Sequence, residues 1–306
     1  MKIAAIVLVT TLVVLLAVWR FAVSAGAVGL LDLADRFVGG TSGIQVAASG
    51  ERYGPLADQR VEVIVPAAQS ATRRPVLLFI FGGAWKSGRP EDYRFVGRTF
   101  ARAGYVVVIA GYRLVPDGVF PAMLEDGAAA ARWTIDNAAR FGGDPARLYL
   151  MGHSAGAYNA AMLALDPQWL ARQQLSPAAI KGLVGLSGPY DFYPFTSPDT
   201  RAAFGHAKDP AATQPLLFVK PGAPPMLLLS GEDDTTVKPR NSLALAKALT
   251  AAGMPSKAVL LAGVDHAGTV MKLAQPFARD RRVIDSALSF LAAHGGASAP
   301  VQGAGD

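Results

Sequence analysis

Short apolar runs alternate along this chain with longer segments in which apolar residues recur at helical spacing. Several of the short runs are unbroken, as expected for strands that are covered on both faces. They predict strands at residues 61–65, 76–81, 105–110, 148–151, 182–186, 226–229 and 258–261. Helical spacing predicts helices at residues 92–103, 122–141, 155–165, 241–252 and 277–293. Such alternation is typical of an α/β fold, with a mostly parallel central sheet and helices on both faces.

The two ends of the chain differ in pattern from its middle. We interpret residues 1–25 as an N-terminal membrane anchor or signal peptide, residues 26–50 as a connector, and residues 294–306 as a flexible tail. The folded domain is expected to span residues 51–293. Within it, residues 188–224 form a long stretch without regular pattern, and they are a possible cap because such loops are usually lids or binding loops.

The N-terminal segment contains an uncharged run from Ile3 to Trp19, which as a helix would be about 25 Å long. This run is just short of a comfortable membrane span and longer than most signal-peptide cores. Arg20 favours an uncleaved anchor, whereas Val23-Ser24-Ala25 fits a signal cleavage site, and a buried helix is a third reading. We therefore expect membrane association through residues 3–19, or export of the domain out of the cytoplasm.

The composition excludes several classes of protein. Hydrophobic residues make up 51% of the chain and charged residues 17%, which is too apolar for disorder and ample for a buried core. The net charge of +6 is not gathered into a basic stripe, so nucleic-acid binding is not expected. The absence of cysteine excludes thiol nucleophiles and cysteine zinc sites, and it leaves serine as the natural covalent nucleophile.

A nucleophilic serine is predicted at Ser154, in the pentapeptide Gly152-His153-Ser154-Ala155-Gly156. The pentapeptide fits G-x-S-x-G, and it lies between a predicted strand and a predicted helix, which is the setting of a nucleophile elbow. Its two glycines would let the turn close without a side chain colliding with neighbouring backbone. The alternative is a glycine-rich turn with an ordinary serine.

Candidates for the base and the acid lie in the loops that follow the last two predicted strands. A serine hydroxyl needs a base, and His266 lies in a loop that would carry it over the end of the sheet. An acid would fix the tautomer of this histidine, and Glu232, Asp233 and Asp234 compete for that role. With Asp234, which we prefer, the chain order is serine, acid, histidine, as expected when such a triad is carried by an α/β fold with a nucleophile elbow.

Backbone donors for an oxyanion are predicted in the small-residue turn that follows the strand at 76–81. The amide of Gly83 or Ala84 is expected to act together with the amide of Ala155, the residue after the nucleophile. Aromatic residues beside this turn and in the possible cap are candidates for substrate contact, with packing on the scaffold as the alternative. The candidate substrate-binding residues are Trp85, Tyr190 and Phe192.

Taken together, these motifs resemble the α/β-hydrolase superfamily, in particular its carboxylesterase and hormone-sensitive-lipase-like branch, with kynurenine formamidases as close relatives. The resemblance covers residues 55–292. Besides the elbow, it includes Phe81-Gly82-Gly83-Ala84-Trp85 against the family's H-G-G-x-W, and Tyr112-Arg113-Leu114 with Pro116, Phe120 and Pro121 against Y-R-L-x-P-x-x-x-F-P. Asp234 stands three residues before Val237, as in the family's D-x-x-V, which ranks it above Asp233.

The resemblance implies a serine hydrolase that cleaves small-molecule carboxylic esters through an acyl-enzyme, without metal or cofactor. An amidase or formamidase with the same triad is one alternative, and a non-catalytic binding protein that keeps the elbow is another. Two residues depart from the family pattern: Phe81 replaces a histidine, and Gly111 stands where an aspartate commonly precedes Tyr-Arg. Since oxyanion donors are backbone groups, we expect the loss of the histidine to alter loop support and pocket polarity more than it affects the oxyanion hole.

Overall fold

The computed structural model describes residues 27–296. In this part of the chain a single 8-stranded sheet has the order β1-β2-β4-β3-β5-β6-β7-β8. The neighbours from β4 to β8 run parallel, whereas β1 and β2, and β2 and β4, pair antiparallel. The mostly parallel sheet predicted from the sequence is therefore confirmed.

All of the predicted strands are present, several of them with extended bounds. The central strands are the most deeply buried, and β4 is buried at every position, which explains its unbroken apolar sequence. The strands are β1 (Ile44–Arg52), β2 (Arg60–Pro66), β3 (Arg74–Ile80), β4 (Val106–Ala110), β5 (Gly143–His153), β6 (Ile180–Leu186), β7 (Met226–Gly231) and β8 (Ser256–Leu261).

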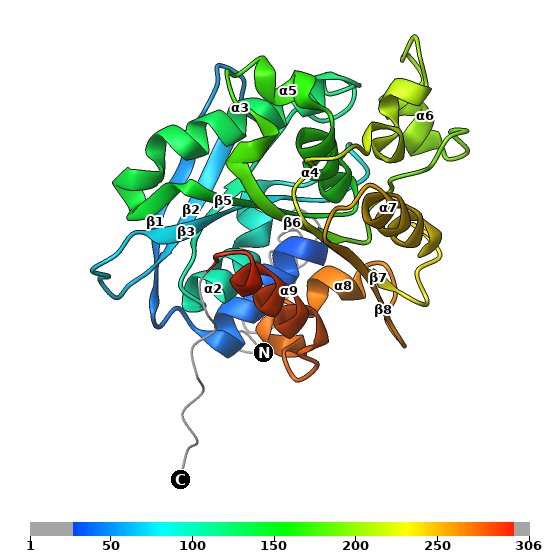
Figure 1. Ribbon diagram of the computed structural model, residues 1–306. Helices are drawn as coiled ribbons and strands as arrows, with labels where there is room; N and C mark the ends of the chain where they lie inside the picture. The colour runs from blue at the N-terminus through cyan, green and yellow to red at the C-terminus, as the bar shows by residue number, and fades with distance from the viewer. Residues whose placement is uncertain (1–26, 297–306) are drawn as a thin grey trace, which may run out of the picture.

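Helices cover both faces of the sheet. Figure 1 shows α3, α4 and α5 on one face and α2, α8 and α9 on the other. The α-helices are α2 (Arg94–Arg102), α3 (Ala122–Asn137), α4 (Ala155–Leu165), α5 (Pro167–Ala171), α6 (Pro198–Phe204), α7 (Arg240–Ala251), α8 (Gly268–Met271) and α9 (Arg282–Ala293). Short 3₁₀ turns are η1 (Pro90–Tyr93), η2 (Ala138–Phe141), η3 (Pro177–Ala179), η4 (Ala211–Thr213), η5 (Pro215–Phe218) and η6 (Gln275–Phe277).

The last helix begins later than the sequence pattern predicts. The pattern places its start at residue 277, but α9 starts at Arg282. The side chain of Asp280 accepts a hydrogen bond from the backbone amide of Arg282, which satisfies one of the free donors at the start of a helix. Apolar periodicity does not reveal a local bond of this kind, which favours a helix start at Arg282.

Residues 26–50 differ from the expected connector. Residues 27–39 are helical, and β1 is an edge strand of the sheet, paired with β2. The pairing of β1 is interrupted by register shifts between Val46 and Ala48 and between Ser49 and Glu51. Because the strand lies at an edge and is largely exposed, its sequence lacks the apolar pattern of the buried strands.

The predicted anchor or signal segment at residues 3–19 and the end of the tail, residues 297–306, lie outside the described residues. From residue 27 to residue 296, no helix combines the length and the apolar character that a membrane span requires.

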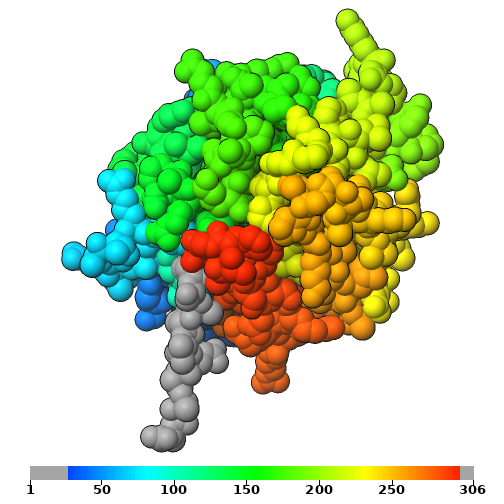
Figure 2. Space-filling model, in the orientation of Figure 1, coloured from blue at the N-terminus to red at the C-terminus, as the bar shows by residue number. Residues whose placement is uncertain are grey.

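The possible cap at residues 188–224 contains α6 and the turns η4 and η5, joined by irregular chain. Figure 1 shows α6 standing away from the sheet, and Figure 2 shows the same segment, in yellow-green, projecting from the rounded body. This segment forms one side of the pocket described below.

Candidate active site

Ser154 occupies a sharp turn between β5 and α4. The strand ends at His153 and the helix begins at Ala155, so only Ser154 separates them. Its backbone has φ 53° and ψ −121°, a conformation that a residue with a side chain seldom adopts. Strain of this kind costs about 1–3 kcal/mol and persists where the surrounding structure holds it. The predicted elbow geometry is therefore present.

The two glycines of the pentapeptide allow neighbouring backbone to come close. A Cβ at Gly152 would lie 2.4 Å from the carbonyl oxygen of Gly156. A Cβ at Gly156 would lie 2.0 Å from the carbonyl oxygen of Ile80, at the end of β3. Neither position can take a side chain without moving backbone, which explains why the turn needs glycine at both.

Ser154, His266 and Asp234 form a hydrogen-bonded chain across the carboxyl ends of three strands. The Oγ of Ser154 lies 2.9 Å from Nε2 of His266. On the other side of the ring, Nδ1 of His266 lies 2.8 Å from Oδ2 of Asp234. Because a carboxylate can only accept, Nδ1 carries the proton, and Nε2 is left free to accept from the serine hydroxyl.

Asp234 is held in place from several sides. Its Oδ1 accepts hydrogen bonds from the backbone amides of Thr236 at 3.0 Å and Val237 at 2.8 Å. Burial by itself would raise the pKa of the Asp234 carboxyl, but the hydrogen bonds from His266 and Val237 outweigh it and lower the pKa below its ordinary value. Asp234 is thus ionised at neutral pH, whereas Asp233 is exposed and does not meet the histidine.

The predicted oxyanion loop follows β3 and lies next to the elbow. A Cβ at Gly82 would lie 3.0 Å from Cβ of Ser154, so the two turns are in close contact. Gly83 has φ 125° and Ala84 φ 53°. Among the described residues, no hydrogen bond occupies the amides of Gly83, Ala84 or Ala155. These amides are available to a substrate oxygen.

The two departures from the family pattern lie together beneath this loop. Phe81 and Gly111 line the same small cavity. The Phe81 ring stacks on Tyr112 with ring centroids 4.8 Å apart and on Tyr93 at 5.4 Å, and the Tyr112 hydroxyl donates to the Phe81 carbonyl oxygen at 3.0 Å. A Cβ at Gly111 would lie 2.3 Å from the carbonyl oxygen of Asp58. Aromatic stacking supports the loop here, and no acidic side chain fits at residue 111.

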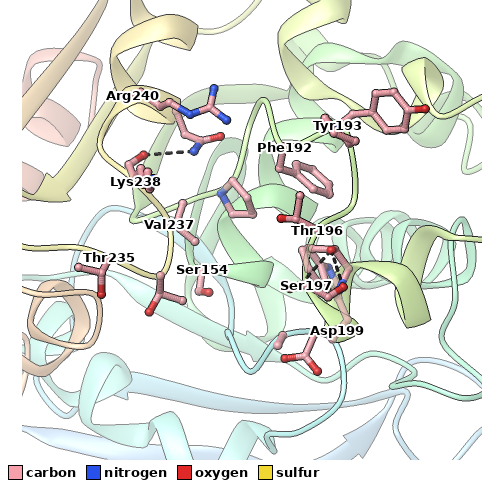
Figure 3. A pocket seen from close by; sticks show the side chains of 17 residues that line it. Ser154, Phe192, Tyr193, Thr196, Ser197, Asp199, Thr235, Val237, Lys238 and Arg240 are labelled. Atoms are coloured by element: carbon pink, nitrogen blue, oxygen red, sulfur yellow. Dashed lines mark hydrogen bonds between the residues drawn. The ribbon is translucent and has the colours of Figure 1, made fainter.

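A pocket of about 480 Å³ opens over Ser154. Figure 3 shows Ser154 between two walls, one from the cap segment with Phe192 and Tyr193 and the other from the loop after β7 with Thr235 and Val237. The lining residues are Ala84, Trp85, Ser154, Pro189, Phe192, Tyr193, Pro194, Thr196, Ser197, Asp199, Thr200, Thr235, Thr236, Val237, Lys238, Arg240 and Asn241. The pocket thus places apolar rings and hydroxyl groups around the same serine.

Two of the three candidate substrate-binding residues line the pocket, and the third does not. Trp85 and Phe192 line the pocket, and their rings lie 6.1 Å apart. Trp85 is also tied to the scaffold, because its Nε1 donates to Oδ1 of Asn159 at 3.2 Å. Tyr190 does not reach the pocket: it is fully buried, and its hydroxyl lies against Gly185 and Gly188. Of the aromatic residues at 190–193, Phe192 and Tyr193 line the pocket, whereas Tyr190 lies in the core.

Three residues that sequence reasoning passed over support the site. The ring of His153 contacts the backbone of His266. Ser187, directly after β6, hydrogen-bonds to Asp234 and receives a hydrogen bond from Thr269 at 3.1 Å. Ser187 has φ 48°, close to the φ of 53° at Ser154. The sequence did hold one signal for Ser187: it directly follows a predicted strand, and ligand sites in such sheets lie just past the strands.

The structure offers no evident metal centre in residues 27–296, where no group of three or more histidine or acidic side chains converges. The site described above consists of a hydroxyl, an imidazole, a carboxylate and backbone amides. This donor set fits acid–base and nucleophilic chemistry.

Several known proteins with similar sequences bear the names of esterases. The chain is 28% identical over 244 residues to isoprenylcysteine alpha-carbonyl methylesterase ICME of Arabidopsis thaliana, covering 70% of this chain and 55% of that protein. It is 30% identical over 244 residues to esterase LipQ of Mycobacterium tuberculosis, covering 74% of this chain and 57% of that protein. The chain therefore spans just over half the length of these relatives.

Solved structures agree with the fold and the family. Thermogutta terrifontis esterase 2, in its apo form and phosphorylated by paraoxon, matches with a TM-score of 0.70 and 25% identity, over 85% of this chain and 97% of that chain. The BD-FAE family model matches residues 61–249, from β2 to α7, which is more than half of the chain. This chain belongs to the BD-FAE family, within the carboxylesterase branch of the α/β-hydrolases.

Proposed function

We propose that this protein hydrolyses carboxylic esters through an acyl-enzyme formed on Ser154. The observation that carries the proposal is the hydrogen-bonded chain from Ser154 Oγ through the His266 ring to Asp234, with distances of 2.9 and 2.8 Å. The esterase names of the relatives support the same reaction. The small-molecule acyl ester expected from the sequence is the substrate class.

In the first half of the reaction, Nε2 of His266 takes the proton of Ser154 as Oγ attacks the ester carbonyl. The C–O bond to the alcohol then breaks, and His266 returns the proton to the leaving oxygen. In the second half, His266 takes a proton from water, the resulting hydroxide attacks the acyl-enzyme, and the acid leaves as Ser154 regains its proton. Asp234 stabilises the charged ring in both halves.

The developing oxyanion would be met by backbone donors on two loops. The amide of Ala155 lies at the start of α4, and the amides of Gly83 and Ala84 lie in the adjoining loop after β3. Preorganised donors of this kind contribute roughly 3–4 kcal/mol each to transition-state stabilisation. The stacking of Phe81 on Tyr112 would hold the second loop in the absence of the family's histidine.

The pocket favours a small or medium-sized ester. Its volume of about 480 Å³ lies in the lower half of the range of ~300–1,000 Å³ typical of ligand pockets. Phe192 and Trp85 offer apolar contact close to the nucleophile, whereas Thr235 and Thr236 offer hydroxyl groups on the opposite wall. We expect activity to peak at short acyl chains and to fall for long ones.

The test is hydrolysis of p-nitrophenyl esters from acetate to long-chain acyl by the wild type, Ser154→Ala and the exposed-serine control Ser289→Ala. Activity in the wild type and the control, with loss in Ser154→Ala, supports the proposal. Paraoxon should add one diethylphosphoryl group to the wild type and to Ser289→Ala, and none to Ser154→Ala, as mass spectrometry would show. A folded wild type that cleaves formamides but no ester would indicate an amidase, and one that reacts with none of these would indicate a binding protein.

We further propose that the protein acts outside the cytoplasm, held or exported by residues 3–19. The proposal is supported by the uncharged run between Lys2 and Arg20. Mass spectrometry of the N-terminus tests it: a start near Gly26 means cleavage, and an intact Met1 or Lys2 means retention as an anchor. A full-length protein found only in the cytosolic fraction would contradict both routes.

A further inference from the structure

The helix at residues 27–39 has its apolar side turned outward. Most exposed positions in this helix carry apolar side chains, and they fall on one stripe because they recur at helical spacing. Phe37 is 89% exposed, Val38 63% and Leu33 49%. Arg36 is the one charged residue among the exposed positions of the helix. We call this surface the outward stripe; it consists of Ala27, Leu30, Leu33, Ala34, Phe37 and Val38.

The inward side of the same helix carries its acidic residues. Arg98 of α2 donates from Nε to Asp35 at 2.6 Å and from Nη2 to Asp32 at 2.7 Å. Asp35 and Arg98 are both buried, and Val28 and Leu31 of the helix are partly buried and pack against the core. Turning the helix to bury its apolar stripe would break a buried ion pair and leave its charges unpaired, which is strongly unfavourable.

Contacts at the end of the helix hold it in the same orientation. Arg102 of α2 donates from Nη2 to the carbonyl oxygens of Gly39 and Gly40, both at 2.9 Å. The backbone amide of Gln275, in η6, donates to Oδ1 of Asp35 at 2.6 Å. Phe277, at the end of the same turn, is 41% exposed. The outward stripe is therefore a fixed surface of the folded domain.

We propose that the outward stripe rests on a lipid bilayer and sets the orientation of the domain on the membrane surface. A helix that lies in the interface buries an apolar face and keeps cationic side chains beside it for the lipid headgroups. Arg36 is exposed and directly precedes Phe37 in the sequence, so it fits that role. The uncharged run at residues 3–19 ends shortly before the helix, so a membrane-bound run would bring the stripe to the bilayer.

A second copy of the chain is a less suitable occupant. A helix of this length is about 20 Å long and about 10 Å wide, so the stripe offers roughly 200 Å². Stable protein interfaces bury about 800 Å² on each partner. The stripe alone is too small for a stable dimer. A domain that residues 3–19 already attach to a bilayer needs no further buried area to stay bound.

The experiment uses the absence of cysteine in the chain. Single cysteines replace Leu33 or Phe37 in the full-length protein, and Leu243→Cys in α7 is the matched control, because Leu243 is 47% exposed and α7 packs at the other end of the sheet. Each variant carries a nitroxide label and is reconstituted in vesicles of phosphatidylcholine and phosphatidylglycerol at 3:1. Collision of the label with oxygen, which concentrates in lipid, is compared with collision with a water-soluble nickel complex.

We expect the labels at residues 33 and 37 to favour oxygen over nickel by at least threefold relative to the label at residue 243. Nickel access at residues 33 and 37 equal to that at 243 would overturn the proposal. Protection from both reagents would also overturn it: spin–spin broadening that vanishes on dilution with unlabelled protein would indicate a second copy, and protection without broadening would indicate cover by residues 1–26. Unchanged hydrolysis of a soluble ester would show that the labelled variants are folded, and the result does not depend on the identity of the substrate.

Discussion

The ring of His153 donates a hydrogen bond from Nε2 to the backbone carbonyl oxygen of His266, at 3.1 Å. The two rings lie 5.1 Å apart between centroids. His153 precedes Ser154 in the chain, so this bond links the elbow to the loop that carries the base. Nδ1 of His153 faces Gly82, where a Cβ would lie 2.9 Å from it. One buried ring therefore contacts both the base loop and the oxyanion loop.

We predict that His153 is a positioning residue for His266. His153→Leu removes the donor, and we expect kcat to fall roughly 10- to 100-fold with little change in KM, because a displaced base loses alignment with the serine. His153→Gln keeps an amide donor at a similar distance from the backbone and should stay within a few-fold of the wild type. Steady-state kinetics on p-nitrophenyl acetate measures both. A folded His153→Leu variant with wild-type kcat would refute this role.

The same histidine should make the domain sensitive to acid. Burial, reinforced by the neighbouring His266 ring, lowers the pKa of His153 from 6.5 to about 3. As the pH falls below about 6.5, the unfolded chain binds a proton that the folded chain refuses, so the free energy of unfolding decreases. The decrease due to this residue should be about 2 kcal/mol at pH 5.

Urea unfolding at pH 7.5, 6 and 5 tests this acid sensitivity, with His153→Gln as the control that lacks the titrating group. The wild type should lose more stability than the variant between pH 7.5 and pH 5. Equal losses in the two proteins would mean that other groups cause the acid sensitivity.

Asp234→Asn separates the two candidate acids of the loop after β7. The asparagine keeps the size of the side chain but does not stabilise the charged ring, and its amide favours the wrong histidine tautomer. We expect kcat to fall roughly 10³- to 10⁴-fold. Asp233→Asn, on an exposed neighbour, should change kcat less than twofold. A larger loss in Asp233→Asn than in Asp234→Asn would reverse the assignment.

Gly111→Ala probes the departure from the family's aspartate. The new Cβ would lie 2.3 Å from the carbonyl oxygen of Asp58, so backbone has to move. We expect destabilisation of about 1–3 kcal/mol, seen as a lower melting temperature. The loop held by Phe81 and Tyr112 should be disturbed as well, so kcat should decrease. An unchanged melting temperature would show that the neighbouring chain yields easily.

The sequence by itself determined the order of the strands and helices and the strand-end positions of Ser154 and His266. Both follow from local causes. Apolar periodicity reflects which side of an element is covered, and the glycines of the elbow are required by contacts within the turn and with the strand beside it. The edge strand β1 was hard to detect for the same reason, because a largely exposed strand has little apolar periodicity in its sequence.

Only the tertiary structure decided which side chains meet. Asp233 and Asp234 are adjacent in the chain, and the bonds from Thr236 and Val237 turn Asp234 toward His266. Tyr190 and Phe192 are two residues apart, yet one is buried in the core and the other lines the pocket. The helix at residues 27–39 turns its aspartates inward because they bind Arg98, which is distant in the sequence. Such choices depend on partners brought together by folding, which no local pattern encodes.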